Sequence, residues 1–291
     1  MDDKESVALP SITALMKDSE AMNQILMRPL ENSDPRVNEV KIRRLYLQAS
    51  AQQWFAPQKL DYDMPINLTD EQRRVWARFH LIFYTLEKMG LNVIQNMMSK
   101  ASAKLRSDEV ASYLSVQAAD EARHVFAIEA YLRKLGTIPK YDHKYHVLGR
   151  AASMGLYRVE NWLFSTLFSE NFASCFLRQA KNADIDPLGA ELCRMLIIDE
   201  SRHIHFLNIV LPDIMERLSL LGKTYVRSSQ FFIMKFTELV SRSLEVDARL
   251  VGLDRRALLE DAFENVERSY EAFGVSRRFL PFPTIRQTVT I

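Results

Sequence analysis

Two short stretches of the chain carry residue types that commonly bind metal ions. Residues 120–124 read DEARH and residues 199–203 read DESRH, so each stretch has a Glu three positions before a His. Side chains three positions apart lie on the same face of an α-helix. A carboxylate and an imidazole that face the same way, twice in one chain, provide half of the ligands of a two-metal site. The other half of such a site is a single Glu from each of two further helices.

The rest of the sequence predicts the helices that would carry these ligands. Only eight Gly and ten Pro occur in 291 residues, and most fall between periodic segments, which favours long helices joined by short connections. Helices are therefore expected over 36–54, 70–105, 107–136, 150–182, 186–220, 223–246 and 255–273. Residues that commonly cap helix N-termini precede four of them, namely Thr69 (with Gln72 as a capping box), Ser107, Asp186 and Asp254.

A helix with a single Glu followed by a helix with the DE-x-RH motif occurs twice, which indicates two helical hairpins in one four-helix bundle. In the first hairpin, Glu87 is the only carboxylate over residues 73–106, whereas the second offers both Glu160 and Glu170. Residues equally far from the turn of a hairpin lie at the same depth. Glu170 matches the depth of Glu200, and Glu160 lies about 12 Å away along the axis. The predicted metal ligands are therefore Glu87, Glu121, His124, Glu170, Glu200 and His203.

The predicted ligand set contains four carboxylates and two imidazoles. Such an oxygen-rich set suits iron or manganese and does not suit the metals that thiolates select. A carboxylate that accepts the free N–H of a ligand His fixes the tautomer of that imidazole. The expected outer partners are Asp120 for His203, Asp199 for His124, and Arg123 and Arg202 for the two Asp residues. For the two Arg residues, a salt bridge on the helix surface is the alternative.

Three further polar side chains lie close to the ligands in the sequence. Tyr84 is three positions before Glu87 and is expected near the site, as a packing residue. His80 is two turns before Glu87. It is expected to be a hydrogen-bonded core residue rather than a residue that lines a substrate route. His205 is two positions after His203, so it is expected to point away from the metals.

The overall composition excludes several other kinds of function. A net charge of +1 gives no electrostatic basis for nucleic-acid binding. No window approaches the ~18 consecutive apolar residues that a membrane span requires. The first residues are acidic and lack the apolar stretch of a signal peptide. Two isolated cysteines, Cys175 and Cys193, do not make a disulfide framework, so a soluble protein of the reducing cytoplasm is expected.

The ligand pattern resembles that of the ferritin-like di-iron carboxylate proteins. The doubled DE-x-RH form is similar to the α-subunits of bacterial multicomponent hydroxylases. Upstream, the run WFAPQKLD at 54–61 and the run LTDE at 68–71 look like the entry of ribonucleotide reductase small subunits and their oxidase relatives. Chain length and helix order also resemble the p-aminobenzoate N-oxygenases. The resemblance covers residues 50–215 and implies an all-α, ferritin-like four-helix bundle with accessory N- and C-terminal helices.

At three positions the chain differs from individual members of this superfamily. Reductase small subunits carry a radical-forming Tyr four residues after the first ligand His, where this chain has Ile128. Oxidases with a cross-linked Tyr carry it five residues before the third Glu, where this chain has Ser165. The p-aminobenzoate N-oxygenases have an additional ligand His four residues before the fourth Glu, where this chain has Leu196. The last difference argues against the N-oxygenase assignment specifically.

The resemblance implies a non-haem di-iron oxygenase that activates O2 to hydroxylate or N-oxygenate a small organic substrate. Two iron ions are the expected cofactor, with a manganese–iron pair as the alternative. An external electron donor is implied, and a homodimer is left open. The alternative functions are a ribonucleotide-reductase-small-subunit-like oxidase or radical-generating subunit and, less favoured, an iron-binding or storage protein.

The domain interpretation is a single ferritin-like domain over residues 1–291. Its core bundle is expected at about 70–220, preceded by an N-terminal arm and helix at 1–69. Two C-terminal helices and a tail are expected at 223–291. The sequence leaves open the substrate, the electron donor, and the choice among C-oxidation, N-oxidation and desaturation.

Overall fold

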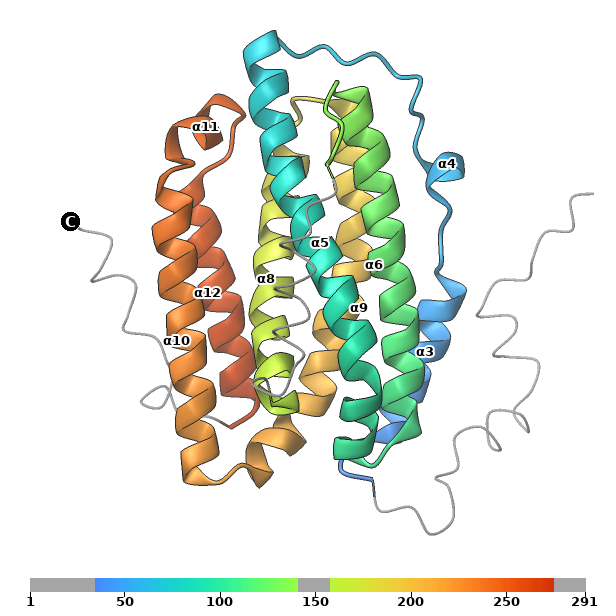
Figure 1. Cartoon of the computed structure of the whole chain (residues 1–291), viewed down its shortest axis with the longest axis vertical. Helices are drawn as coiled ribbons and strands as arrows, with labels where there is room; N and C mark the ends of the chain where they lie inside the picture. Colours follow the sequence, from blue (N-terminus) through green and yellow to red (C-terminus); the bar gives the residue numbers. More distant parts are fainter. Residues whose placement is uncertain (1–34, 141–157, 275–291) are drawn as a thin grey trace, which may run out of the picture.

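The computed structural model describes residues 35–140 and 158–274, and these residues form helices without any strand (Figure 1). The helices are α3 (Glu39–Ala51), α4 (Ala56–Lys59), α5 (Asp70–Leu105), α6 (Asp108–Lys134), α8 (Val159–Ala183), α9 (Pro187–Arg217), α10 (Leu220–Arg242), α11 (Glu245–Leu250) and α12 (Arg255–Ala272). The predicted all-α class is therefore confirmed. Within the described ranges, no helix is both long enough and apolar enough to cross a membrane.

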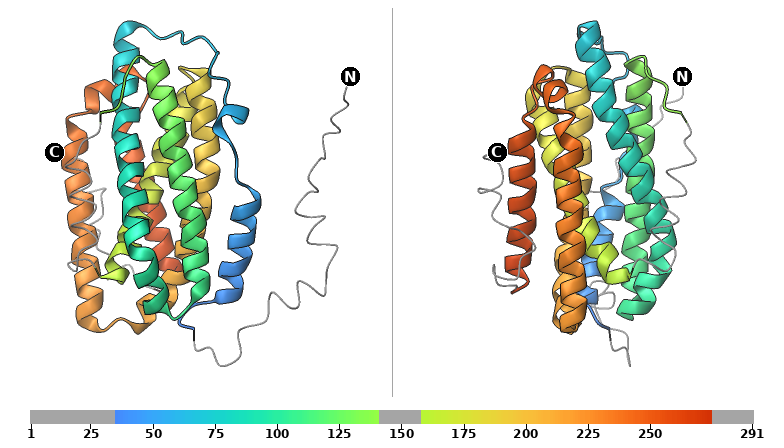
Figure 2. Two further views of the ribbon diagram at one scale, coloured as in Figure 1. Left: turned by 45° about the vertical axis from the view of Figure 1, so that its right-hand side comes forward. Right: turned by 60° about the vertical axis from the view of Figure 1, so that its left-hand side comes forward.

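Four long helices, α5, α6, α8 and α9, form the central bundle. α5 and α6 pack as one antiparallel hairpin, and α8 and α9 pack as a second (Figure 1). α6 and α8 run in the same direction, so α6 ends and α8 begins at opposite ends of the bundle. α3 lies along α6 and α9 on one side, while α10 and α12 cover α8 on the other (Figure 2). The bundle therefore has accessory helices on both flanks, as predicted.

Most helix starts are fixed by the hydrogen bonds that the sequence predicts. Thr69 Oγ1 accepts the backbone N–H of Gln72 at 3.2 Å, and the Gln72 side chain accepts the N–H of Thr69 at 3.1 Å. These two bonds complete the predicted capping box of α5. Asp186 and Asp254 cap α9 and α12 by accepting the backbone N–H three residues further on, at 2.9 and 3.0 Å.

The predicted side-chain cap at Ser107 is wrong. Ser107 does precede the first residue of α6, but its buried hydroxyl makes no hydrogen bond within the described part of the chain. The first turn of α6 instead contains Asp108 and Glu109. Their negative charges interact favourably with the unpaired N–H groups and the positive dipole end of the helix.

Several helix boundaries differ from the prediction. The first helix spans 39–51 rather than 36–54, because Asn38 caps it by accepting the N–H of Lys41 at 3.1 Å. The single helix expected over 223–246 is α10, which begins after the capping residue Ser219, followed by the short helix α11. α9 continues through Pro212 and ends at Arg217. Residues 1–34 of the predicted N-terminal arm, residues 150–157 of the helix predicted over 150–182, and residues 275–291 of the predicted tail lie outside the described residues.

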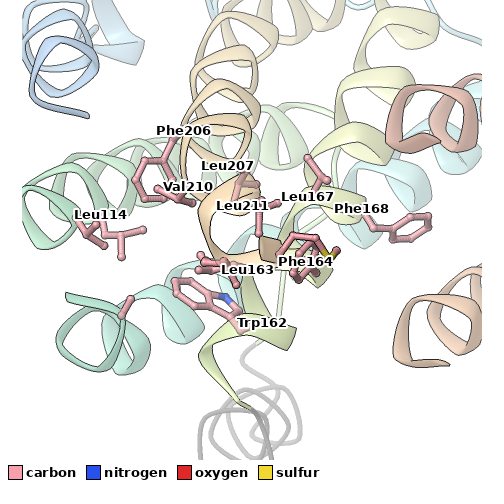
Figure 3. Packing of buried hydrophobic residues seen from close by; sticks show 14 of the residues in the cluster. Leu114, Trp162, Leu163, Phe164, Leu167, Phe168, Phe206, Leu207, Val210 and Leu211 are labelled. Atoms are coloured by element: carbon pink, nitrogen blue, oxygen red, sulfur yellow. The ribbon is translucent and has the colours of Figure 1, made fainter. Parts of the chain in front are cut away.

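Two groups of buried apolar residues fill the bundle, one in each half. Figure 3 shows the first group, in which Phe164 of α8 and Phe206 and Leu211 of α9 pack together. The second group contains Trp76 of α5 and Tyr131 of α6. Along each central helix, the two apolar groups are separated by a short stretch that contains buried polar side chains. These stretches are 84–94 in α5, 114–127 in α6, 168–175 in α8 and 196–206 in α9. The bundle therefore has a polar layer at mid-height.

Candidate metal centre

The polar layer brings together all six side chains that the sequence predicts as metal ligands. Every one of them is buried, and each central helix contributes at least one. A Glu and a His three positions apart face the same way on a helix, so α6 and α9 contribute a pair each. We call these side chains the carboxylate–histidine cluster, which consists of Glu87 from α5, Glu121 and His124 from α6, Glu170 from α8, and Glu200 and His203 from α9.

Two of the four carboxylates each approach a single imidazole. Glu87 Oε2 lies 3.1 Å from His124 Nδ1, and Glu170 Oε2 lies 3.7 Å from His203 Nδ1. The Nδ1 atoms of both histidines therefore point into the cluster. The centroids of the two imidazole rings are 6.1 Å apart.

The other two carboxylates lie between the histidines. Glu121 approaches His124 Nδ1 at 3.9 Å and His203 Nδ1 at 3.6 Å. Glu200 approaches the same two atoms at 3.5 and 3.2 Å. Each of these two Glu side chains can therefore contribute oxygen atoms to both halves of a two-metal site.

The cluster fits two divalent cations in both geometry and charge. Two sets of ligand atoms lie within 4.8 Å of one another, Glu87 with Glu121 and His124, and Glu121 with Glu170 and His203. Four ionised carboxylates would match the charge of two divalent ions. Oxygen and imidazole nitrogen ligands suit iron and manganese.

An aspartate from the opposite repeat contacts the outer nitrogen of each histidine. Asp199 Oδ2 lies 3.0 Å from His124 Nε2, and Asp120 Oδ2 lies 3.3 Å from His203 Nε2. These are the cross-repeat pairs that the sequence predicts. Because each Asp accepts a hydrogen bond from Nε2–H, the Nδ1 lone pairs remain available to the interior of the cluster.

Two arginines neutralise this pair of aspartates. Arg123 contacts Asp120 and donates to Asp199 at 2.8 Å, while Arg202 contacts Asp199 and donates to Asp120 at 3.2 Å. Both Asp carboxylates are buried, and so is Arg202. This network is largely enclosed, which makes it different from a salt bridge on the helix surface.

The pKa shifts follow from burial and from the neighbours of each group. Burial raises the pKa of Glu87 to about 7. Burial also raises the pKa values of Glu121 and Glu200 well above the ordinary value, and repulsion from nearby carboxylates adds to the effect. Burial would raise the pKa of Asp120 as well, but the hydrogen bond and charge of His203 lower it to about 2. Burial would also raise the pKa of Glu170, but hydrogen bonds with Glu200 and His203 lower it. Glu87, Glu121 and Glu200 therefore need cations to ionise together, whereas Glu170 and Asp120 are already stabilised as anions.

Sequence reasoning missed the contacts of the chain segment that follows α3. Trp54 Nε1 donates to Asp199 at 2.8 Å, and the indole ring lies under the Arg123 guanidinium at 4.9 Å. Gln53 donates to Asp120 at 2.7 Å and accepts from Arg123. Trp54 and Asp199 are 145 positions apart, so no local spacing indicates this contact.

Two residues of α6 were also missed, although helical spacing would have found them. Gln117 lies one turn before Glu121, and its amide donates to Glu170 at 3.2 Å. Tyr113 lies one further turn away and is fully buried, with its ring stacked on Phe206 at 4.2 Å. The hydroxyl of Tyr113 makes no hydrogen bond within residues 35–140 and 158–274.

The remaining predicted residues have the following places. The hydroxyl of Tyr84 donates to Glu129 at 3.2 Å, away from the cluster carboxylates. His80 is in the core as expected, but only its Nδ1 is bonded, to the Trp76 carbonyl at 3.0 Å, and its Nε2 has no partner among the described residues. His205 is exposed, as expected. The rejected alternative ligand Glu160 pairs with Lys104 at 3.1 Å.

The arrangement of the helices defines a fold class, the ferritin-like helical bundles, and solved structures of this class are similar to the chain. An R2-like ligand-binding oxidase reconstituted with a Mn/Fe cofactor superposes with a TM-score of 0.59 at 17% identity, over 79% of this chain and 92% of that one. Another R2-like ligand-binding oxidase structure, with an Fe/Fe cofactor, superposes with a TM-score of 0.57 at 19% identity, over 79% of this chain and 92% of that one. The R2-like ligand-binding oxidase from Sulfolobus acidocaldarius gives 0.59 at 18% identity, over 84% and 93%. The predicted ferritin-like fold is thereby confirmed.

A family model then identifies the particular family. The p-aminobenzoate N-oxygenase AurF family matches residues 67–269, so the chain belongs to that family. No curated protein matches the sequence. The protein is accordingly an oxidoreductase that acts with O2. The buried Leu196, at the position where the resemblance places an additional ligand His, does not remove the chain from the family.

Proposed function

We propose that this protein is a two-metal monooxygenase that oxidises a small organic substrate, with electrons from an external donor. The carboxylate–histidine cluster would hold two iron ions or one manganese and one iron. The hard donor set supports this choice of metals. The Fe/Fe and Mn/Fe cofactors of the R2-like ligand-binding oxidases, which share the fold, also support it.

The observation that carries the proposal is the placement of Glu121 and Glu200 between the two imidazoles. Four buried carboxylates in one layer are unfavourable unless cations compensate them. A purely structural layer of this size would be expected to pair its Glu side chains with Lys or Arg, as Glu160 pairs with Lys104. Here the arginines contact the outer aspartates instead.

When bound, such a metal pair supplies the reduction of O2 and the oxidising power. The side chains of the protein hold and orient that pair. Asp199 and Asp120 hold the proton of each imidazole on Nε2, so that the Nδ1 atoms would be free to bind the metal ions. The two apolar groups on either side of the polar layer exclude water from it. At Gly90, a Cβ atom would lie 3.6 Å from Glu121 Oε2, so the absence of a side chain leaves space beside this carboxylate.

An aromatic amine is the proposed substrate class, because the family is named for the N-oxygenation of p-aminobenzoate. Leu196 is an alkyl side chain where the N-oxygenases carry an additional imidazole ligand. A metal pair at this site would therefore have one imidazole fewer and more open coordination. For this reason, hydroxylation at carbon is the alternative reaction on the same substrate class.

The test measures metal content and O2-dependent oxidation with the full-length protein. Loaded anaerobically with Fe(II), it should bind two ions per chain and oxidise p-aminobenzoate or a related arylamine when O2 and a reductant are added. Glu121→Ala and His203→Ala should lose the paired metal centre and the reaction. The matched control is Glu160→Gln, which removes a buried carboxylate of α8 outside the cluster. This variant should keep both the paired metal centre and the reaction. One ion per chain in the wild type would contradict the proposed ligand set.

A radical-generating oxidase is the second candidate, and Tyr113 is the observation that favours it. Its phenol is fully buried, and burial raises its pKa, with the charges of His203 and Asp120 also acting on it. Electron paramagnetic resonance after exposure of the reduced, metal-loaded protein to O2 separates the two functions. An oxygenase gives no persistent tyrosyl signal. A persistent signal that disappears in Tyr113→Phe but not in Tyr84→Phe would favour the radical-generating function.

A further inference from the structure

Two adjacent hollows lie along the outer side of α9, and we call their combined surface the α9 groove. The first has a volume of about 240 Å³ and lies between the end of α5, the start of α8 and the end of α9. The second has a volume of about 530 Å³ and lies between α3 and α9. Asp213 lines both hollows, so they are neighbours. From His205 to Arg217, the groove follows α9 for about 18 Å.

The packing of α3 explains the larger hollow. α3 lies mainly against α6 and contacts α9 less extensively, so space remains on the side of α9. Polar side chains line this space, among them Gln48 of α3 and Asn208 of α9. The buried Oδ1 atom of Asn208 has no hydrogen-bond partner within the described ranges. The larger hollow is therefore polar, unlike the core of the bundle.

The α9 groove is strongly basic, although the whole chain has a net charge of only +1. Among the described residues, six cationic side chains line the groove, but only two carboxylates do, Glu160 and Asp213. Glu160 is already paired with Lys104 at 3.1 Å, and Arg36 donates to a backbone carbonyl. Charge of one sign in a hollow attracts partners of the opposite sign. The six cations are Arg36, Lys41, Arg44, Lys104, Arg158 and Arg217.

One end of the groove lies at the height of the carboxylate–histidine cluster. His205 lines the groove and is exposed, and it is two positions after His203 of the cluster. Two positions correspond to about 3 Å along α9, and the two side chains point to different sides of the helix. A partner bound beside His205 would therefore be separated from the cluster by little more than the thickness of one helix, about 10 Å.

A chain of hydrogen bonds joins this end of the groove to the cluster. Gln48 lines the groove, and the exposed Gln52 lies one turn further along the chain. The side chain of Gln52 accepts from the buried Arg202 at 3.2 Å. Arg202 donates to Asp120 at 3.2 Å, and Asp120 lies 3.3 Å from His203 Nε2. The surface is thus connected to a predicted metal ligand through only two intervening side chains.

We propose that the α9 groove is the docking site of the external electron donor, and that this donor is a small, acidic electron-transfer protein. The proposal rests on the monooxygenase function, because that reaction consumes two electrons and two protons for each O2 and releases one oxygen atom as water. Each encounter would transfer one electron from the reduced redox centre of the donor protein to the oxidised metal pair. Two encounters would then complete each turnover.

The size of the groove also suits such a partner. Electron-transfer complexes are among the weak protein complexes that bury less than about 1,200 Å² in total. A basic surface about 18 Å long can supply its share of so small an interface. Complementary charge steers the encounter and raises the association rate, which suits a donor that must bind, react and leave repeatedly.

The first test measures binding to the metal-free, full-length protein, with an acidic [2Fe–2S] ferredoxin as the probe. Binding should be clear at about 10 mM salt and at least about 10-fold weaker at about 150 mM, because the Debye length falls from about 30 Å to about 8 Å. The double variant Arg44→Glu, Arg217→Glu reverses two exposed charges of the groove. It should weaken binding by about 100-fold at low salt.

The matched control is Arg74→Glu, which reverses a cation at the opposite end of α5 from the groove. The side chain of Arg74 is 78% exposed. This variant should bind the ferredoxin as the wild type does. Circular dichroism and thermal melting should show that all variants fold, since every substituted side chain is on the surface.

The second test measures the reduction of the oxidised, iron-loaded protein by anaerobic stopped-flow absorbance. Reduced ferredoxin is compared with a small, uncharged reductant, a reduced phenazine, which needs no docking site. The ratio of the ferredoxin rate to the phenazine rate should fall by about 100-fold in the double variant and stay unchanged in Arg74→Glu. A protein without a metal pair would fail with both reductants. Failure of the docking proposal alone would leave the phenazine reaction intact.

Three outcomes would overturn the proposal. The first is a wild type that does not bind the ferredoxin at low salt. The second is an equal loss of binding in Arg74→Glu and in the double variant. The third is a groove that binds free flavin mononucleotide or duplex DNA more tightly than the ferredoxin, which would make it a site for phosphate groups instead of an acidic protein.

Discussion

The carboxylate of Glu121 lies within 3.9 Å of both histidine Nδ1 atoms and shares its layer with three other buried Glu side chains. Replacement by Gln keeps the shape of the side chain and removes one negative charge. Because burial and repulsion from the other cluster carboxylates both disfavour ionised Glu121, Glu121→Gln should raise the melting temperature of the metal-free protein by a few degrees. The same variant should lose most of the stabilisation by metal.

The measurement is differential scanning calorimetry with and without Mn(II), which avoids oxidation during the scan. The wild type should melt about 10 °C higher when Mn(II) greatly exceeds its dissociation constant. Glu160→Gln serves as the control, because it breaks an ion pair with Lys104 and should lower the melting temperature in both conditions. A wild-type melting temperature that does not respond to Mn(II) would argue against a buried metal centre.

His80 should make the protein sensitive to acid. Burial lowers its pKa from 6.5 to about 4, although the hydrogen bond to the Trp76 carbonyl acts in the opposite direction. The folded state therefore binds fewer protons than the unfolded state between these two values. The stability that neutral His80 allows is fully retained above about pH 6.5 and is lost as the pH falls toward 4. At pH 5 the loss in the free energy of unfolding is about 2 kcal/mol.

Chemical denaturation at pH 7.5 and pH 5.0 tests this contribution. His80→Leu keeps an apolar side chain of similar size in the core, and it should be nearly as stable as the wild type at pH 7.5. At pH 5.0 the free energy of unfolding of the variant should rise by about 2 kcal/mol relative to that of the wild type. His205→Leu removes an exposed imidazole and is the matched control. The interpretation fails if the two variants change equally with pH.

At the level of elements, the chain segment that follows α3 supports the metal centre from outside the bundle. Gln53 donates to Asp120 at 2.7 Å and accepts from Arg123, and Asp120 in turn bonds His203. Gln53→Ala should therefore lower the affinity for Mn(II) by about 10-fold, because changes to the outer partners of metal ligands have effects of this size. Competition with a chromophoric chelator measures the affinity.

Two further variants make this experiment specific. Gln58→Ala changes an exposed Gln of α4, and it should bind Mn(II) as the wild type does. Gln53→Glu keeps an acceptor for Arg123 but places a second carboxylate beside Asp120. If Gln53 acts by orienting Asp120, this variant should also bind Mn(II) more weakly. Wild-type affinity in Gln53→Ala would show that the segment after α3 only packs against the bundle.

The elements that could be predicted are those with local determinants. The capping box at Thr69 and the caps at Asp186 and Asp254 involve residues three positions apart, so the sequence alone indicates them. The choice of Glu170 over Glu160 also followed from helix rise alone. By contrast, the Trp54–Asp199 bond joins residues 145 positions apart, and it depends on how α3 docks across α6 and α9. The division between α10 and α11 was missed because both segments have the same helical periodicity.

In the whole molecule, the cluster lies where the two hairpins meet. Glu121 belongs to the first hairpin, yet its ligand atoms lie within 4.8 Å of those of Glu170 and His203 from the second. Metal ions bound by both hairpins should therefore join them and suppress opening between them. Regions that open locally exchange their amide hydrogens more quickly than regions that open only on global unfolding.

Hydrogen–deuterium exchange of the full-length protein, with and without Mn(II), should show this difference. Protection should increase in the segments of α5, α6, α8 and α9 around the polar layer, because selective binding to the closed state stabilises it. α10 and α12 contribute no side chain to the cluster. Amide exchange in these two helices through local opening should therefore be the same with and without Mn(II). Increased protection in one hairpin only would show that metal binding does not join the two hairpins. Glu121→Gln should show no Mn(II)-dependent protection in any of these segments.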